Sequence, residues 1–494
     1  MRKEKVAEYD KAIRTTKKDH WINWLEDAMG NDLWIANKYI TNPAGDGGKT
    51  CIPTLVTKDN EGNATTATSN ESKSEVFAKT LFPPPPSRSA VPPDFEYQEP
   101  AAPWSDITGE QLRKTIVKLS PYKAPGPDGV ANIVFQRCPV LQPYLLSLFN
   151  AALSLCTYYD PWRESITVIL RKPGRPDYSV PKAYCPIALL NTTAKLVSAI
   201  VTDRASHILE THGLLPATHF GGRPGHSTED LLLLLETTIK HAWRQHKVAL
   251  VLFLDIEGAF PNAVTDQLLH NMKKRGLPPE IVGFTERLLD NRKTKLRFDD
   301  YESEWFPLRN GIGQGDPLSM LLYVIYSSDL VNTARKENGE LALAFVDDTA
   351  LVVVGKSFVE THQKLKDMLE RQGGGYEWSA NHNSRFETNK FALMDFSLNR
   401  AKPRPNMNLR GVTIKSAPSH KFLGVIIDNE LRWTAQAAYA TAKGAKYTVL
   451  LRRLSTTSWG VPAKLICQLY LSVAIPKITY AVAVWLQPSL RTRD

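Results

Sequence analysis

The sequence has few cysteines and no long hydrophobic run, and both shortages limit what the protein can be. Its 5 cysteines among 494 residues include no Cys-x-x-Cys pair and no neighbouring histidine, so we expect reduced thiols and no zinc site. No apolar segment follows the basic residues at the N-terminus, so we expect no secretory signal. Nowhere do apolar residues continue for the ~20 positions that a membrane-spanning helix needs. These shortages favour an intracellular protein without a membrane span.

Acidic residues are outnumbered by basic ones, which leaves a formal net charge of +10. This excess favours a polyanionic partner, either nucleic acid or an acidic membrane surface. A generic basic surface fits the same charge equally well, so charge alone does not decide. The length allows about two to four domains, and the hydrophobic fraction of 43% is that of an ordinary globular protein.

The N-terminal part has little regular patterning. Residues 1–40 are basic and rich in tryptophan, with a helical rhythm, and residues 59–74 are polar. Eight prolines then fall between Pro83 and Pro103. Such a segment favours extended polyproline geometry and cannot pack a core, so we interpret it as a linker. Folding should resume at Thr108, where Thr-Gly-Glu-Gln forms a capping box ahead of an amphipathic helix.

Helices and strands are mixed in the rest of the chain. Helices are predicted at 192–211 and 227–246 by their apolar spacing and end signals. Residues 248–254 form an unbroken apolar run, which is typical of a strand buried on both faces. Residues 341–354 predict a β-hairpin with two adjacent aspartates at its tip. This mixture predicts an α+β fold rather than a doubly wound parallel sheet.

Three carboxylates stand at the ends of these strands. Asp255 follows the buried run, and Asp347 and Asp348 form the tip of the hairpin. Clustered acids repel one another and persist where a cation lies between them, and hard oxygen ligands suit Mg²⁺ or Mn²⁺. Two such ions about 3.5–4 Å apart can promote an in-line phosphoryl displacement. Taken singly, each aspartate is better explained as a polar turn or a cap, so the neighbouring motifs decide.

Those motifs resemble the reverse transcriptases. The segment 255–260, Asp-Ile-Glu-Gly-Ala-Phe, resembles the first palm motif of that family, in which an aromatic residue follows the aspartate by five positions. Residues 345–348, Phe-Val-Asp-Asp, resemble its aromatic-x-Asp-Asp motif. Between them, residues 310–319 resemble its Gln-Gly-x-Pro-Leu-Ser loop. The order and spacing of the three motifs also fit.

Further motifs resemble the reverse transcriptases of non-LTR (LINE-type) retrotransposons, among them those of fungi. They are 123–129 ahead of the fingers, 186–190 and 220–225 in the fingers, 373–390 after the catalytic hairpin, and Phe422-Leu423-Gly424 of the primer grip. The resemblance implies a right-hand polymerase, with fingers, an antiparallel palm sheet and a partial helical thumb, preceded by a helical or disordered N-terminal extension. The expected divisions are 1–107 (extension and proline-rich linker), 108–254 (fingers and first palm elements), 255–430 (palm and primer grip) and 431–494 (partial thumb), with the reverse transcriptase domain at about 152–428. No endonuclease or RNase H domain is recognised, so we expect one module of a larger element product, which does not itself nick DNA.

The resemblance implies roles for the palm residues. Asp255 and Asp347 would be the principal metal ligands, assisted by Asp348 and the backbone carbonyl of Ile256. Phe260 would lie beneath the incoming sugar, where a 2′-hydroxyl would collide with its ring. The alternative for Phe260 is an ordinary core aromatic.

Other residues would contact the incoming nucleotide. Gln314 and Gly315 would lie against it, with glycine permitting close backbone approach; their alternative is a simple turn. Lys172 and Arg175, on an expected fingers hairpin, would neutralise the triphosphate, or else form a solvated basic turn. Lys390 would act as general acid toward pyrophosphate, or be an ordinary surface lysine.

One residue departs from the family pattern. The family has arginine before the Pro-Ile of its second fingers motif, whereas this chain has Cys185. Arginine would hold the triphosphate through two hydrogen bonds, which a thiol cannot reproduce. Its loss should cost a few kcal/mol, or about two orders of magnitude in rate. The sequence thus predicts impaired turnover beside an intact metal site, with Lys172 and Arg175 compensating in part.

The resulting functional prediction is an RNA-directed DNA polymerase. It would extend a DNA primer along an RNA template with dNTPs and Mg²⁺, as part of target-primed integration of a mobile element. A chromosomal target implies a nuclear site of action, although no targeting signal is recognised. A catalytically silent nucleic-acid-binding remnant is the second interpretation, favoured by Cys185. A templated RNA polymerase on the same palm is disfavoured by Phe260.

Overall fold

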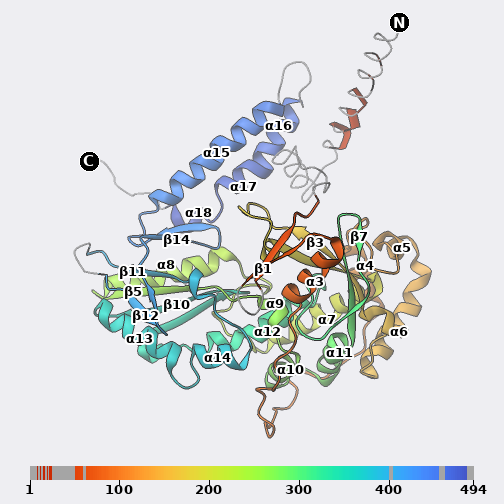
Figure 1. Ribbon diagram of the computed structural model, residues 1–494, viewed down its shortest axis with the longest axis horizontal. Helices are drawn as coiled ribbons and strands as arrows, with labels where there is room; N and C mark the ends of the chain where they lie inside the picture. Colours follow the sequence, from red (N-terminus) through yellow and green to blue (C-terminus); the bar gives the residue numbers. More distant parts are fainter. Residues whose placement is uncertain are drawn as a thin grey trace. The chain divides into compact units, whose positions relative to one another are not determined.

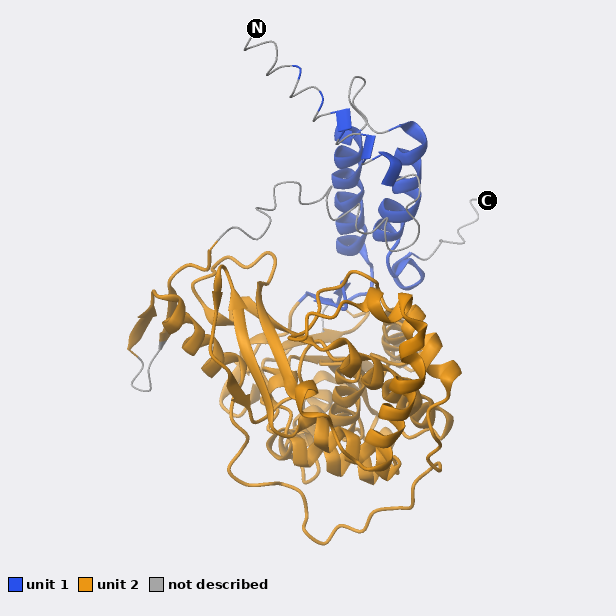
Figure 2. Cartoon of the chain, turned by 90° about the vertical axis from the view of Figure 1, so that its right-hand side faces the viewer, with its two compact units in different colours: residues 1–49, 418–494 blue, residues 50–417 orange. Residues whose placement is uncertain are grey.

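The structure of the chain is a computed structural model, in which the described residues are 51–58, 63–399, 404–454, 462–486 and scattered positions between 8 and 24. Most of the helical rhythm expected over 1–40 lies outside these residues. The chain divides into two compact units, residues 50–417 and residues 1–49 with 418–494 (Figures 1 and 2). In the described part of the chain, no helix is both long and apolar enough to cross a bilayer.

A four-stranded antiparallel sheet forms the centre of the larger unit. Its strands, in spatial order, are β11 (Ala392–Phe396), β5 (Val248–Leu254), β10 (Asp348–Gly355) and β9 (Glu340–Phe345). Side chains of β5 such as Leu250 and Leu252 share a core with α13 (Phe358–Glu370), while α8 (Thr228–Arg244) contacts β5, β9 and β10. All seven residues of β5 are buried, which confirms the predicted strand.

The strands of a second sheet come from both sides of β5 in the sequence. Its members are β4 (Tyr184–Leu190), β3 (Glu164–Arg171), β6 (Arg292–Phe298), β7 (Tyr301–Glu302) and β8 (Phe306–Leu308). β3 pairs antiparallel with β4 and parallel with β6. Lys172 and Arg175 therefore lie on the loop of a β3–β4 hairpin, as predicted.

Residues 51–58 and 63–82, part of the expected extension, fold against this second sheet. They form β1 (Leu55–Lys58), β2 (Ala64–Ala67) and α3 (Asn70–Leu81). Leu55 and Phe77 share a core with Tyr184 of β4 and Phe298 of β6. The backbone amide of Ile52 also donates to the carboxylate of Asp299 at 3.0 Å. This part of the chain thus adds to the core of the second sheet.

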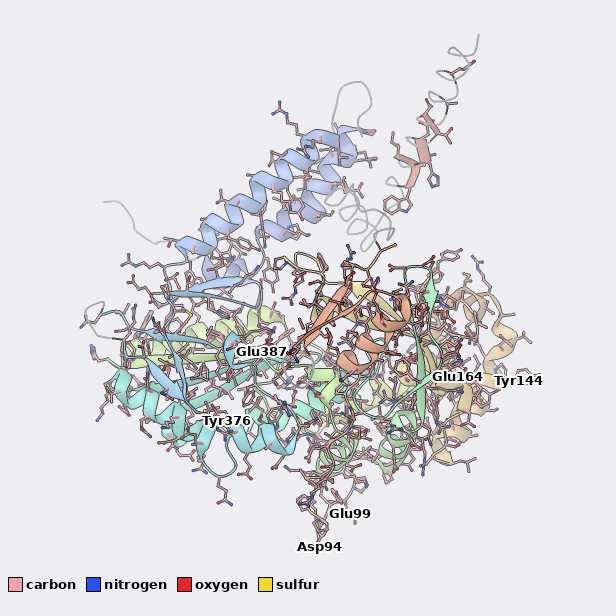
Figure 3. The ribbon with its side chains drawn as sticks, viewed as in Figure 1. Asp94, Glu99, Tyr144, Glu164, Tyr376 and Glu387 are labelled. Carbon is pink, nitrogen blue, oxygen red and sulfur yellow. The ribbon has the colours of Figure 1, made fainter. Side chains whose placement is uncertain are left out.

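The proline-rich segment has no helix or strand between residues 83 and 103, yet it makes specific contacts. The hydroxyl of Tyr97 lies 3.0 Å from Nδ1 of His270, and Phe95 packs edge-on to the same imidazole. The amide of Ala101 donates to the carbonyl of Gly276 at 2.8 Å. Asp94 and Glu99, labelled in Figure 3, lie on this segment. The segment therefore packs on α10 (Thr265–Lys274) and the turn after it, whereas its role as a linker stays a prediction.

Two of the predicted helix starts agree with the structure and are fixed by side-chain caps. Thr108 and Gln111 form the capping box of α4 (Gly109–Lys118). Ser227 and Asp230 form that of α8, which ends two residues before the predicted end. The remaining helices and strands of this unit are α5 (Asn132–Arg137), α6 (Gln142–Ser154), α7 (Thr192–Thr211), α9 (Ala259–Asn262), α11 (Pro279–Leu289), α12 (Ser319–Val331), α14 (Gly375–Asn381), β12 (Met407–Leu409) and β13 (Val412–Ile414).

The smaller unit is a hairpin followed by helices. The hairpin consists of β14 (Ser419–Phe422) and β15 (Val425–Asp428), and the helices are α15 (Thr434–Leu454), α16 (Ala463–Leu469), α17 (Ile475–Ile478) and α18 (Val482–Trp485). Tyr447, Leu451, Leu465 and Leu469 form its core. The helical character predicted for 431–494 is therefore confirmed where the chain is described, and the predicted primer-grip hairpin belongs to this unit.

One glycine of the 220–225 motif supports the acidic hairpin tip. The amide of Phe220 donates to the carbonyl of Ala344 in β9 at 2.8 Å, which brings Gly221 against the tip. A Cβ on Gly221 would lie 2.4 Å from the backbone nitrogen of Val346. Only glycine therefore fits between the 220–225 segment and the hairpin.

We expect Gly221→Ala to lower the free energy of unfolding by about 1–3 kcal/mol, because the added methyl overpacks a contact between two backbones. Thermal unfolding followed by circular dichroism measures the change. Gly109→Ala is the matched control, since its Cβ would meet nothing closer than Leu146 Cδ2 at 3.9 Å. Equal stability of the two variants would contradict this account of Gly221.

Candidate active site

The register of the central sheet brings the three predicted acids to one edge. Asp348 pairs with Phe345, so the β9–β10 hairpin has a two-residue loop formed by Val346 and Asp347. Leu254, the last residue of β5, lies opposite Thr349 of β10. Asp255 therefore continues β5 beside the hairpin tip that carries the other two carboxylates. The structure thus places together the three residues that the sequence motifs indicate.

The hairpin tip is strained. Val346 has φ 63°, in the left-handed region that β-branched residues rarely adopt. Residues held in such conformations cost of order 1–3 kcal/mol and persist where the surroundings fix them, which is common at functional sites. Here Gly221 packs against the backbone of Val346, and pairing with β5 holds the far side of β10.

The three carboxylates perturb one another. Desolvation by the surrounding protein raises the pKa of Asp347, although its side chain keeps solvent contact, and the charge of Asp255 raises it further. Desolvation and the charges of Asp347 and Asp255 raise the pKa of Asp348 to about 6. Each added negative charge is therefore unfavourable here, which is the electrostatic setting that a cation relieves.

Lys390 supplies one positive charge to this cluster. Its Nζ lies 2.9 Å from Oδ2 of Asp255 and is also paired with Glu387, which is labelled in Figure 3. Desolvation lowers the pKa of Lys390, but the hydrogen bonds to Glu387 and Asp255 outweigh it, so the pKa is raised overall. The backbone holds this arrangement, because the amide of Glu387 donates to the carbonyl of Asp255 at 2.9 Å.

The chemistry of the donors fits a hard divalent cation. Carboxylate oxygens are the ligands that Mg²⁺ and Mn²⁺ prefer. Residues 385–387 bond to Asp255 and Glu257, so the intervening carbonyl of Ile256 points away from that strand. Among the described residues, no three acidic, histidine or cysteine side chains already converge on one point as ligands. Oδ2 of Asp255 is paired with Lys390 in this arrangement.

Phe260 is fixed by the packing of its ring and by its backbone. It lies in α9, which begins after Gly258 at φ 58°. Its ring stacks on that of Tyr323 in α12, with centroids 4.7 Å apart and planes at 24°. Its carbonyl accepts from the amide of Ile312 at 2.8 Å, which joins it to the 310–319 loop. The ring is half-buried, so part of it stays accessible.

The 310–319 loop is clamped to β4. The carbonyl of Gln314 accepts from the amide of Ala188 at 2.7 Å. Gly315 has φ 133°, and a Cβ there would lie 2.3 Å from the carbonyl oxygen of Ala188. The close approach that requires this glycine is therefore to β4, while an approach to a nucleotide stays a prediction. Asp316 accepts from the hydroxyl of Ser198 at 3.0 Å, and burial raises its pKa to about 6.

Cys185 lies beside this loop. Its Sγ donates to Oε1 of Gln314 at 3.2 Å. Burial raises the pKa of the thiol, and Lys172 opposes this effect. The position at which the family has arginine therefore contacts the glutamine of the predicted nucleotide motif.

The basic residues of the β3–β4 hairpin differ in their surroundings. Arg175 is exposed next to Gly174. Nζ of Lys172 donates to the carbonyl of Lys182 at 3.1 Å, and Lys182 forms an ion pair with Glu257, two residues after Asp255. Sequence reasoning missed Lys182, because its position depends on the return path of the hairpin and on no motif of its own.

The predicted primer grip forms a tight hairpin in the smaller unit. Leu423 and Gly424 form its two-residue loop, with φ 46° and 86°. Positive φ at both loop positions is typical of the turn that best matches the twist of paired strands. The hydroxyl of Tyr480 donates to the carbonyl of Leu423 at 3.0 Å.

A basic groove of about 690 Å³ adjoins this hairpin within the same unit. It is lined by Lys421, Gly424, Tyr439, Ala442, Lys443, Lys446, Tyr447, Pro476, Lys477 and Tyr480. Nζ of Lys421 lies 3.0 Å from the hydroxyl of Tyr439, and Lys443 lies over the same ring. The hydrogen bond from Lys421 and the charge of Lys443 lower the pKa of Tyr439. The lining contains no acidic residue, so the groove is suited to an anion.

Comparison with known proteins agrees with these features. The reverse transcriptase (RNA-dependent DNA polymerase) family matches residues 170–427. The RNA-directed DNA polymerase from mobile element jockey of Drosophila melanogaster is 27% identical over 394 residues, which cover 78% of this chain and 42% of that protein. The probable RNA-directed DNA polymerase from transposon X-element of the same species is 28% identical, over 76% of this chain and 41% of that protein.

The chain thus spans about two fifths of the length of these relatives, which are non-LTR retrotransposon proteins. Among solved structures, an apo telomerase from Candida tropicalis, truncated from its C-terminal domain, gives a TM-score of 0.38 at 12% identity, over 54% of this chain and 53% of that one. The family match covers more than half of the chain and includes both acidic motifs and the loop between them. This chain therefore belongs to the reverse transcriptase family, as its motifs predicted.

Proposed function

We propose that this chain is an RNA-directed DNA polymerase that extends a DNA primer along an RNA template with dNTPs. The observation that carries the proposal is the meeting of Asp255, Asp347 and Asp348 at one edge of the antiparallel sheet, with the pKa of both hairpin acids raised. The printed names of its relatives support the same reaction. The context would be integration of a non-LTR element, so the site of action would be nuclear.

Divalent metals are general to the family, and Mg²⁺ is the proposed ion here, with Mn²⁺ as a substitute. Asp255, Asp347, Asp348 and the carbonyl of Ile256 would hold it. When bound, it would supply activation of the primer hydroxyl and stabilisation of charge on the leaving group. Lys390, already next to Asp255, is the proposed proton donor to pyrophosphate.

The nucleotide would lie between the palm and the β3–β4 hairpin. Phe260 would exclude a 2′-hydroxyl, and Gln314 and Gly315 would border the base and sugar. Lys172 and Arg175 would face the triphosphate. Lys182 is added to this basic group, since its ion pair with Glu257 holds it near the first palm motif.

Replacing the central acid should abolish synthesis. We expect Asp347→Asn to reduce primer extension on poly(rA)·oligo(dT) by on the order of 10³-fold, because it removes the negative charge of a proposed metal ligand. A gel shift with the same duplex should be unchanged. Asp94→Asn, on the proline-rich segment, is the control and should extend primers normally. Full activity of Asp347→Asn would rule out the proposed site.

Cys185 supports a second candidate function, a nucleic-acid-binding protein whose turnover is impaired. We expect Cys185→Arg to raise kcat/KM for dNTPs by about 10²-fold, because a guanidinium restores a bidentate contact to phosphate. Cys185→Ser keeps the size of the side chain and adds no positive charge, so it should give no gain. Steady-state primer extension measures both variants, and an arginine variant no faster than the parent chain would refute the impairment hypothesis.

The basic groove of the smaller unit should bind the nucleic-acid backbone. We expect Lys443→Gln and Lys446→Gln each to weaken duplex binding similarly for all sequences and to reduce the slope of log K against log salt by about 1. Fluorescence anisotropy with a labelled primer–template at several salt concentrations measures both quantities. Lys464→Gln, an exposed lysine of α16 outside the groove, should leave the slope unchanged. An equal loss at Lys464 would indicate a generic basic surface instead.

A further inference from the structure

Phe260 rests on a residue that no sequence motif identified. Tyr323 of α12 is fully buried, at 0% exposure, and its ring is the one on which Phe260 stacks. With centroids 4.7 Å apart and planes at 24°, the two rings are nearly parallel. The half-buried ring of Phe260 therefore has a flat, rigid surface behind it.

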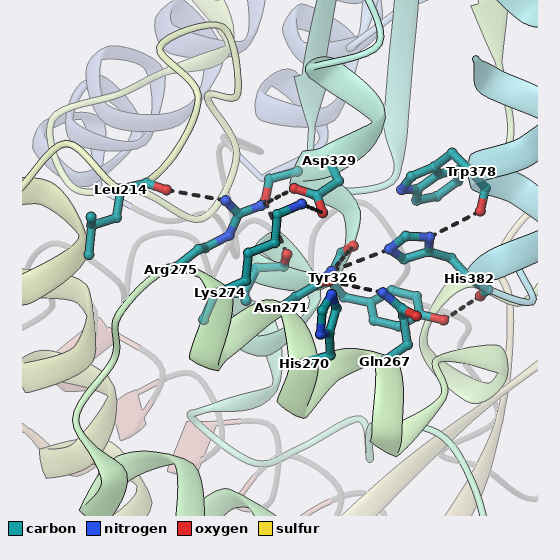
Figure 4. Close-up of polar contacts among 12 residues, drawn as sticks. Leu214, Gln267, His270, Asn271, Lys274, Arg275, Tyr326, Asp329, Trp378 and His382 are labelled. Carbon is teal, nitrogen blue, oxygen red and sulfur yellow. Dashed lines mark hydrogen bonds and ion pairs between the residues drawn. The ribbon is translucent and has the colours of Figure 1, made fainter. Parts of the chain in front are cut away.

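Tyr323 is itself held in place from behind. Its ring lies 6.2 Å from that of Tyr326, one turn further along α12. The hydroxyl of Tyr326 accepts from the amide of Val264 at 3.1 Å and donates to the carbonyl of His382. The side-chain amide of Asn271 donates through Nδ2 to the backbone carbonyl of Tyr326 at 3.2 Å, as part of the network drawn in Figure 4.

These contacts also hold the segment that carries Phe260. Val264, which bonds to Tyr326, lies four residues after Phe260. The segment that carries Phe260 is therefore attached to α12 twice, through its ring at Tyr323 and through its backbone at Tyr326. Because Tyr323 is fully buried behind it, the ring of Phe260 cannot move inward toward α12.

The hydroxyl of Tyr323 does not explain why tyrosine is present. It is buried, and it has no hydrogen-bond partner among the described atoms. A buried, unpaired hydroxyl is unfavourable, so the contribution of this residue to the site comes from its flat ring. The ring of Tyr323 contacts those of Tyr326 and Phe260, and of these two only Phe260 is predicted to face the nucleotide.

We propose that Tyr323 is a positioning residue for sugar selection, which holds the Phe260 ring where it collides with a 2′-hydroxyl. This inference rests on the proposed function, in which Phe260 faces the incoming sugar. Exclusion of one oxygen atom depends on small displacements of the excluding ring. Removal of the support should let Phe260 sink toward α12, so that ribonucleotides fit better while deoxynucleotides are little affected.

The experiment measures ternary-complex formation, which needs no turnover. The full chain is bound to a primer–template with a dideoxy-terminated primer and a templating adenine, and the affinities for dUTP and UTP are compared. These nucleotides differ only at the 2′ position. Tyr323→Leu is expected to reduce the preference for dUTP about tenfold. Tyr323→Phe, which keeps the ring and removes the unpaired hydroxyl, should keep the parent preference.

Two further variants separate positioning from general damage. Val324→Ala also empties space in α12, but Val324 faces Gly222, so it should change the melting temperature and not the preference. Tyr323→Met fills the volume without a flat ring and should lower the preference with a smaller loss of stability, which covers the case that Tyr323→Leu fails to fold.

A double mutant tests the route of the effect. Phe260→Ala should lower the preference further than Tyr323→Leu, and adding Tyr323→Leu to Phe260→Ala should change nothing more, because the residue acts through the ring that is gone. If Phe260→Ala lowers the preference while Tyr323→Leu and Tyr323→Met do not, the inference about Tyr323 is overturned and the proposed role of Phe260 stands. If Phe260→Ala has no effect, both are overturned.

Discussion

The pairing of β5 with β10, with Leu254 opposite Thr349, is the constraint on which the site depends. Every side chain of β5 is apolar and buried, so the strand's own pattern does not distinguish this register from one shifted by a residue. The register is instead fixed at the strand's end. The two-residue loop at Asp347 sets where β10 begins, and residues 385–387 bond to the backbone of Asp255 and Glu257. A slip of one residue would move Asp255 away from the hairpin acids and break these bonds.

Two local conflicts lie at the same edge. Val346 is held in an unfavourable conformation, and the hairpin acids carry charges that their surroundings disfavour. Lysines offset part of the negative charge, Lys390 at Asp255 and Lys182 at Glu257. Strain and repulsion that a fold does not itself need are expected where function requires them.

Much of this could be predicted from the sequence because it depends on local signals. The β5 run, the acidic hairpin and the α8 cap follow from periodicity and capping, and the three aspartates follow from motifs. Contacts set by tertiary packing could not be predicted. Examples are the packing of Leu55 and Phe77 on the second sheet, the ion pair of Lys182 and the stacking of Tyr323 on Phe260, each of which joins segments whose proximity no spacing encodes. The motif predicts that Gly315 allows close approach of a nucleotide, whereas the neighbouring carbonyl of Ala188 already requires glycine there.

The link between β4 and the 310–319 loop bears on whether the chain turns over. Cys185 donates to Gln314, and Ala188 bonds to the backbone of the same residue, so the loop keeps its place although the family's arginine is absent. Compared with arginine, Cys185 therefore lacks a positive charge but keeps the local fold. Loss of a charge lowers the rate of a reaction but leaves the site folded. Loss of the local fold would remove the site as well as the rate. The contacts of Cys185 and Ala188 thus keep β4 and the 310–319 loop joined without an arginine at position 185.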